Sequence, residues 1–157
     1  MAESVSLKHF LRTLELGRIR LGMRDHEVAA ILGKPDAVGG VSNKYQNPSL
    51  WKYGDVEFCF NQQTRELSLI VITFWEPGFP SGGSAIQLDP WLIKGGLKLN
   101  ELCRSLKSEG IEYREVEPIN FGTRELLVNS SISMIFNEDE KEFPDRTGLC
   151  KLCASER

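Results

Sequence analysis

Two ten-residue segments of this chain carry nearly the same strand pattern, and this repeat limits the fold more than any other feature. The first, residues 51–60 (WKYGDVEFCF), reads as two short strands about Gly54 and Asp55; the second, residues 127–136 (LVNSSISMIF), follows seventy-six residues later. In both, apolar residues alternate into a closing Phe-Asn pair (Val56, Phe58, Phe60, Asn61; Ile132, Met134, Phe136, Asn137). A period of two residues is typical of half-buried strands. The sequence therefore predicts a duplicated chain.

A helical pattern precedes each repeat. Apolar residues fall at helical spacing in residues 22–35 and again in residues 96–110 (Val28, Ile31, Leu32; Leu99, Leu102, Cys103, Leu106). Another amphipathic helix opens the chain, with Ser6 as its cap and Gly17 placed to end it. Strand patterns occupy residues 67–74, 111–117, 124–129, 131–137 and 149–154, and a weaker one lies in residues 37–46. We predict an α+β fold of two tandem units, each a helical opening followed by an antiparallel sheet of about four strands.

Proline and glycine mark a boundary between the two units. Residues 75–95 contain three prolines and a glycine-rich cluster, so the regular patterns stop there. We therefore assign residues 1–74 to unit one, 75–95 to an irregular connection and 96–157 to unit two. The aromatic residues of the connection, Trp75, Phe79 and Trp91, are expected either to pack over the seam between the units or to form a partner-binding loop.

Composition narrows the classes of partner. The chain has 157 residues with 19 basic and 22 acidic side chains, and its whole net charge of −3 comes from the second half. Such a balance gives no overall positive electrostatic field that would attract nucleic acid. No apolar run reaches membrane-spanning length either. The first residues lack the pattern of a signal peptide, so we expect a cytoplasmic protein whose four cysteines stay reduced.

Catalytic and metal-binding patterns are weak. The chain has two histidines, His9 and His26, and no glycine-rich phosphate loop. The pair Cys150 and Cys153 has the spacing of a metal or redox motif, but on a strand these side chains point to opposite faces unless a bulge intervenes. The carboxylates of residues 138–142 are typical of a solvated turn. We therefore expect no catalytic residues, no metal and no cofactor.

Residues 21–36 (LGMRDHEVAAILGKPD), followed by paired strands with an aromatic hairpin, resemble the opening of the small outer-membrane assembly lipoproteins of the SmpA/OmlA group. Taken twice in tandem, the pattern also resembles the β-lactamase inhibitor proteins, which present an antiparallel sheet to another protein. The resemblance implies helices on one face of a sheet and a free opposite face. Arg24 departs from it, because such openings carry Ser or Thr there.

From these observations we expect a non-enzymatic module that binds another protein through the exposed sheet face, as an inhibitor or a toxin-neutralising, immunity-type protein does. The predicted contact residues are Trp51, Tyr53, Glu57, Phe79 and Trp91, with Trp51 and Tyr53 as anchors because large aromatics dominate interfaces. Two alternatives stay open. One is a small-ligand carrier or enzyme with a cavity between the units, and the other is a subunit that pairs with its own copy, giving a homodimer.

Overall fold

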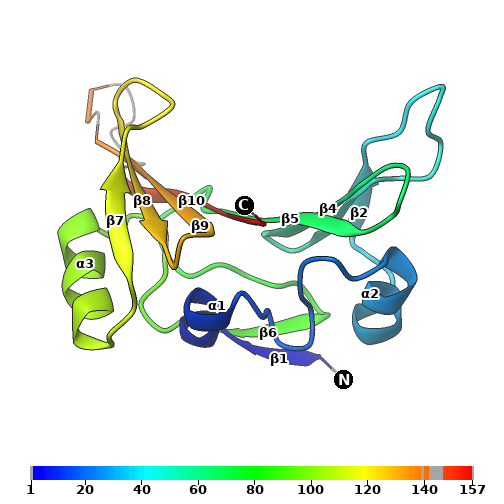
Figure 1. The fold of residues 1–157 in the computed structure, drawn as a ribbon, viewed down its shortest axis with the longest axis horizontal. Coiled ribbons are helices and arrows are strands. Elements are labelled where there is room, and N and C mark those ends of the chain that lie inside the picture. Colours follow the sequence, from blue (N-terminus) through cyan, green and yellow to red (C-terminus); the bar gives the residue numbers. More distant parts are fainter. Residues whose placement is uncertain (1, 139, 142–146, 157) are drawn as a thin grey trace.

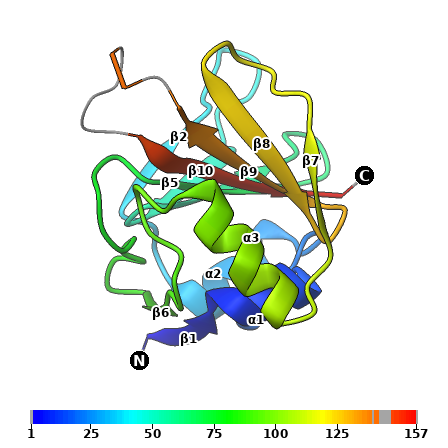
Figure 2. The same cartoon turned by 90° about the vertical axis from the view of Figure 1, so that its left-hand side faces the viewer.

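The computed structural model describes residues 2–138, 140–141 and 147–156. A large antiparallel sheet forms one layer, and three helices lie on one side of it (Figure 1). A small parallel sheet of two strands lies on that same side, next to the helices, as the view turned by 90° also shows (Figure 2). The fold is therefore mixed α+β, as the sequence predicts.

The large sheet has eight strands in the order β2-β3-β4-β5-β10-β9-β8-β7. Their bounds are β2 (Ala37–Gly39), β3 (Leu50–Tyr53), β4 (Val56–Phe60), β5 (Leu67–Thr73), β7 (Tyr113–Val116), β8 (Thr123–Val128), β9 (Ile132–Asn137) and β10 (Gly148–Ser155). Each half follows the chain as an antiparallel meander, and β5 pairs with β10 where the halves meet. This confirms the expectation that the apolar segment 67–74 is a central strand, since it has the composition of a strand buried between neighbours.

The sequence did not predict the small sheet. It pairs β1 (Glu3–Ser6) with β6 (Ile86–Asp89), which lies inside the segment expected to be an irregular connection. Each strand has only four residues, which is too short for an alternating pattern to stand out. Pairing with β6 ties the N-terminal segment to the connection.

The helices begin and end for identifiable reasons. α1 (Leu7–Thr13) is capped as predicted, since the hydroxyl oxygen of Ser6 accepts a hydrogen bond from the His9 N–H at 3.1 Å. It ends before the predicted Gly17, because Leu14 already has a left-handed backbone. α2 (Asp25–Leu32) starts without Ser or Thr; instead, Glu27 Oε2 accepts from the Arg24 N–H at 2.8 Å. The third helix is α3 (Leu99–Ser108).

The core lies between the large sheet and the helices. Ladder pairing places Val56 opposite Ile72 and Phe58 opposite Ile70, and all four side chains are fully buried. Strand β9 buries Ile132, Met134 and Phe136 on the same face of the sheet. The predicted alternation of both segments is therefore confirmed. Each such side chain contributes about 1.5–3 kcal/mol through removal of apolar surface from water.

Among the described residues, no helix has both the length and the hydropathy needed to cross a membrane.

Candidate partner-binding surface

The strand register divides the large sheet into two faces of different character. In each strand, the residues that pair with the buried residues of β4 and β9 face the helices. The residues that alternate with them point to the opposite face of the sheet, which no helix covers (Figure 1). We call this second surface the open face. Its side chains are those of Lys52, Glu57, Cys59, Leu69, Val71, Thr73, Lys151, Cys153, Ser133, Ile135, Glu125, Leu127 and Arg114.

The predicted anchors Trp51 and Tyr53 do not lie on the open face, so this expectation is wrong. The turn at Gly54 and Asp55 pairs Tyr53 with Val56 and Trp51 with Phe58, which puts both aromatics on the helix-covered face. Tyr53 is 0% exposed, and its hydroxyl donates to the carbonyl oxygen of Gly33 at the end of α2, 2.8 Å away. Trp51 is partly buried, with its ring centre 4.7 Å from that of Phe60. Both residues belong to the core.

The other three predicted contact residues are spread over different parts of the molecule. Glu57 lies on the open face, where its carboxylate is 3.9 Å from the Lys52 ammonium. Phe79 is exposed on the connection, with Lys94 Nζ 5.9 Å from its ring centre. Trp91 packs against the core beside α1, where Lys8 Nζ lies 5.6 Å from the ring. The five residues therefore do not form one surface.

Trp75 is the exposed aromatic that belongs to the open face. It follows β5, its side chain is 55% exposed, and Lys52 Nζ lies 6.0 Å from its ring centre. Because Lys52 also reaches Glu57, the three side chains form one continuous patch. A pocket of about 230 Å³ adjoins Trp75 and is lined by Asp55, Phe74, Glu76 and residues 77–80. An exposed tryptophan beside a small pocket is typical of an interface anchor.

The part of the open face from β5 to β8 is closely packed although no helix covers it. Val71 and Leu127 are buried, and so is Glu125, at 7% exposed. The Ser133 hydroxyl donates a hydrogen bond to Glu125 Oε1. Cys153 stands opposite Ser133 in the ladder. This part of the face thus combines apolar side chains with a carboxylate and its hydroxyl donor.

The cysteines do not form a reactive or cross-linked site. None of the four forms a disulfide, and burial raises the pKa of Cys59, Cys103 and Cys153, which keeps these thiols protonated at neutral pH and lowers their nucleophilicity. The register of β10 shifts between Leu149 and Lys151. The straight alternation assumed for Cys150 and Cys153 is therefore wrong, because a bulge interrupts the strand at Cys150. The Cys150 thiol donates to the Ile135 carbonyl, 3.3 Å away.

Two loops extend from the ends of the large sheet on the side away from the helices. They are residues 40–49, between β2 and β3, and residues 117–122, between β7 and β8 (Figure 1). The second loop carries Ile119 at 85% and Phe121 at 98% exposed, and the first carries the exposed Val41. Single exposed apolar side chains are normal on protein surfaces, so these loops do not by themselves mark an interface.

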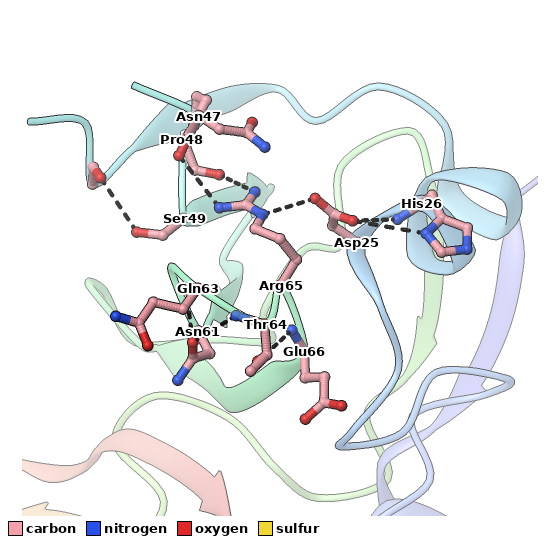
Figure 3. Close-up of polar contacts among 11 residues, drawn as sticks. Asp25, His26, Asn47, Pro48, Ser49, Asn61, Gln63, Thr64, Arg65 and Glu66 are labelled. Atoms are coloured by element: carbon pink, nitrogen blue, oxygen red, sulfur yellow. Dashed lines mark hydrogen bonds and ion pairs between the residues drawn. The ribbon is translucent and has the colours of Figure 1, made fainter. Parts of the chain in front are cut away.

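Arg65 fixes the base of the 40–49 loop (Figure 3). Its guanidinium donates to Asp25 Oδ2 at 2.9 Å and to the carbonyl oxygens of Pro48 at 2.6 Å and Asn47 at 3.3 Å. Its backbone is left-handed, with φ of 61°. The preceding turn is held by Asn61 Oδ1, which accepts from two backbone N–H groups. One side chain thus connects the start of α2, the loop and the β4–β5 turn.

Replacement of Arg65 by alanine should therefore loosen the 40–49 loop. Ionic hydrogen bonds of this kind contribute about 1–3 kcal/mol, so amide hydrogen exchange in residues 40–49 should accelerate by about tenfold to a hundredfold. Arg18→Ala is the matched control, because Arg18 pairs with Glu3 away from this loop. Equal exchange rates in the two variants would show that Arg65 does not restrain the loop.

The described residues contain no group of three His, Cys, Asp or Glu side chains arranged to hold a metal ion. The pocket beside Trp75 is smaller than the roughly 300–1,000 Å³ of most small-molecule sites. Two other pockets, of about 380 Å³ along β1 and β6 and about 410 Å³ beside residues 15–31, fall within that range. The acidic turn at residues 138–142 lies partly outside the described residues, since 139 and 142 are not among them.

Comparison with protein-family models found no matching family, and searches of curated proteins and of solved structures found no significant match either.

The predicted contact residues did not include three parts of this surface, but signals for two were present. Trp75 was expected to pack over the seam or to form a partner-binding loop; it follows the predicted strand 67–74 and alternates with the buried Phe74, so it faces away from the core. Phe121 is an isolated aromatic in a polar turn. Glu125 gave no such signal, because its burial depends on neighbours from β9 and β10 that only the sheet order brings together.

Proposed function

We propose that this protein binds another protein through the open face, without turnover, as an inhibitor or an immunity-type, toxin-neutralising protein does. The observation that supports this most is the patch of Trp75, Lys52 and Glu57 on a broad sheet face. Trp75 supplies a large amphipathic anchor, and the closely packed part of the face supplies apolar area. Interfaces commonly combine an aromatic hot spot with a polar rim in this way.

We further propose that the sheet consists of two related units, residues 1–74 and 96–157, each a helix followed by four strands. The strand order supports this, because it reads as two meanders that meet at β5 and β10. Such an arrangement spreads a face over eight strands while the helices cover only its back. The exposed loops 40–49 and 117–122 would then occupy the two ends of a single binding surface.

The alternative functions have weaker support. A carrier or enzyme with a cavity between the two units has less support, because the pocket beside Trp75 is small and the larger pockets, of about 380 and 410 Å³, lie along β1 and β6 and beside residues 15–31. Self-association through sheet edges is disfavoured, because β2 has only three residues and β7 presents the exposed charges of Arg114 and Glu115. Four cysteines without a disulfide suit a reducing compartment, so we propose that the protein acts in the cytoplasm.

Site-specific photo-cross-linking tests the proposed surface. A benzoylphenylalanine probe at Lys151, which is exposed on the open face, should cross-link a partner protein in native lysate, whereas the same probe at His26 on α2 should not. Mass spectrometry identifies the partner, and native mass measurement distinguishes it from a second copy of this chain. Cross-linking from His26 alone would place the interface on the helices and contradict the proposal.

Replacement of Trp75 by alanine should then weaken binding to that partner by about thirtyfold, since truncation of an aromatic hot spot costs about 2 kcal/mol or more. The fold should persist by circular dichroism because the side chain is more than half exposed. His26→Ala, on the far side, should bind like the unmodified protein. Equal affinities of the two variants for the partner would show that Trp75 is not part of the interface.

A further inference from the structure

Glu125 is the only charged side chain among the described residues that is nine-tenths buried, and it lies on the open face in β8, next to the edge strand β7. It pairs with Ile135 in the ladder, so its side chain shares a face with Leu127, Ser133 and Cys153. Charged residues are rarely this buried unless they are paired. The position of this carboxylate therefore calls for a physical reason.

Within the described chain, the charge of Glu125 is not compensated. Its one hydrogen-bond donor there is the Ser133 hydroxyl, and no described Lys, Arg or His forms an ion pair with it. Lys151 and Arg114 are the basic residues on the same face on either side, and both are exposed. A carboxylate can accept about four hydrogen bonds. One hydroxyl therefore leaves most of this capacity open to a donor from outside the chain.

We infer that Glu125 receives a basic side chain, Arg or Lys, that a partner protein inserts into the open face at β8. This inference rests on the proposed function and names the chemistry of its partner. A guanidinium or ammonium group would pair with the carboxylate, while Leu127, Ile135 and Cys153 would contact the aliphatic stem. A buried ion pair completed across an interface favours one partner over others, because a partner without the cation leaves the charge unpaired.

The inference predicts opposite effects of Glu125→Gln on the free protein and on binding. Glutamine keeps an acceptor for the Ser133 hydroxyl and removes the charge, so the melting temperature of the free protein should rise by about 2 °C or more. If Glu125 served only the fold, the same substitution would lower it. Glu57→Gln, on the same face but paired with Lys52, is the stability control and should not raise the melting temperature.

Peptide selection tests the partner's chemistry. Random twelve-residue peptides selected on the full chain should share an Arg or Lys, and Glu125→Gln should weaken the selected peptides by about tenfold or more. Glu101→Gln, an exposed site on α3, should change their affinity less than twofold, and peptides with citrulline in place of Arg should not bind.

The outcomes separate this inference from the proposed function. Peptides that are weakened by Trp75→Ala but not by Glu125→Gln, or that lack a shared basic residue, would overturn the inference and leave the proposed surface standing. Peptides insensitive to both substitutions, or failure to select any peptide, would count against both. A lower melting temperature of Glu125→Gln would assign the residue to the fold and also overturn the inference.

Discussion

Replacement of Tyr53 by alanine should lower the free energy of unfolding by about 3–5 kcal/mol, the usual cost of removing a large aromatic side chain from a core. Tyr53 is fully buried, its ring lies edge-on 5.7 Å from that of Phe58, and its hydroxyl holds the end of α2 through Gly33. Urea unfolding followed by circular dichroism measures the change. Tyr45→Ala, in the 40–49 loop and partly exposed, is the matched control and should cost about 1 kcal/mol or less.

The hydroxyl of Tyr53 adds a pH dependence that phenylalanine would remove. Burial, with a smaller effect of Asp36, raises the pKa of Tyr53 to about 12 from its ordinary value of 10.0. Below pH 10 both the folded and unfolded states hold the proton, so Tyr53 contributes no pH dependence there. Between pH 10 and 12 the unfolded chain releases the proton first, so stability falls as pH rises. Tyr53→Phe should lack this part of the loss, and identical pH profiles would contradict the assignment.

Replacement of Gly148 by alanine should lower the free energy of unfolding by about 3 kcal/mol or more, because two costs combine at this position. Gly148 begins β10 with φ of 90°, and a Cβ atom there would lie 2.5 Å from the Gly96 carbonyl carbon and oxygen. The contact cannot relax by side-chain rotation, since Gly96 and Leu97 are hydrogen-bonded to Leu149. Urea unfolding of the purified variant measures the loss.

Gly110→Ala separates the two costs. Gly110 also has a left-handed backbone, with φ of 68°, but a Cβ atom there meets nothing within 4 Å. Its substitution should therefore cost only the backbone strain, about 1–2 kcal/mol. If both variants lose the same stability, the close approach of Gly96 to β10 contributes nothing to the cost of Gly148→Ala. The segment at Gly96 is then not held tightly against β10.

The face of the sheet on which a side chain lies decides whether a partner could reach it. The aromatics of β3 are packed in the core, so the proposed binding surface consists of Trp75 and of the residues between the buried positions of each strand. Substitutions of Trp51 or Tyr53 would still reduce binding, but through loss of the fold. Stability measurements on the same variants are therefore needed to read any binding result on this hairpin.

The sequence by itself determined most of the local structure. Alternation identified both hairpins and the central strand 67–74, and apolar residues at helical spacing located the helices, because these signals act between residues close in the chain. The two-residue turn at Gly54 and Asp55 even implied that Trp51 and Tyr53 share a face with Phe58, although we had expected them opposite. The α+β class could thus be predicted without coordinates.

Only the tertiary structure decided the candidate site. Pairing of β5 with β10 joins segments about eighty residues apart, and it places Cys153 and Lys151 on the same surface as Glu57 and Trp75. The burial of Glu125 and the pairing of β1 with β6 arise in the same way, from neighbours distant in the chain. Periodicity fixes which residues of one strand share a face, but it carries no information about which strands meet, because long-range pairing depends on the packing of the whole core.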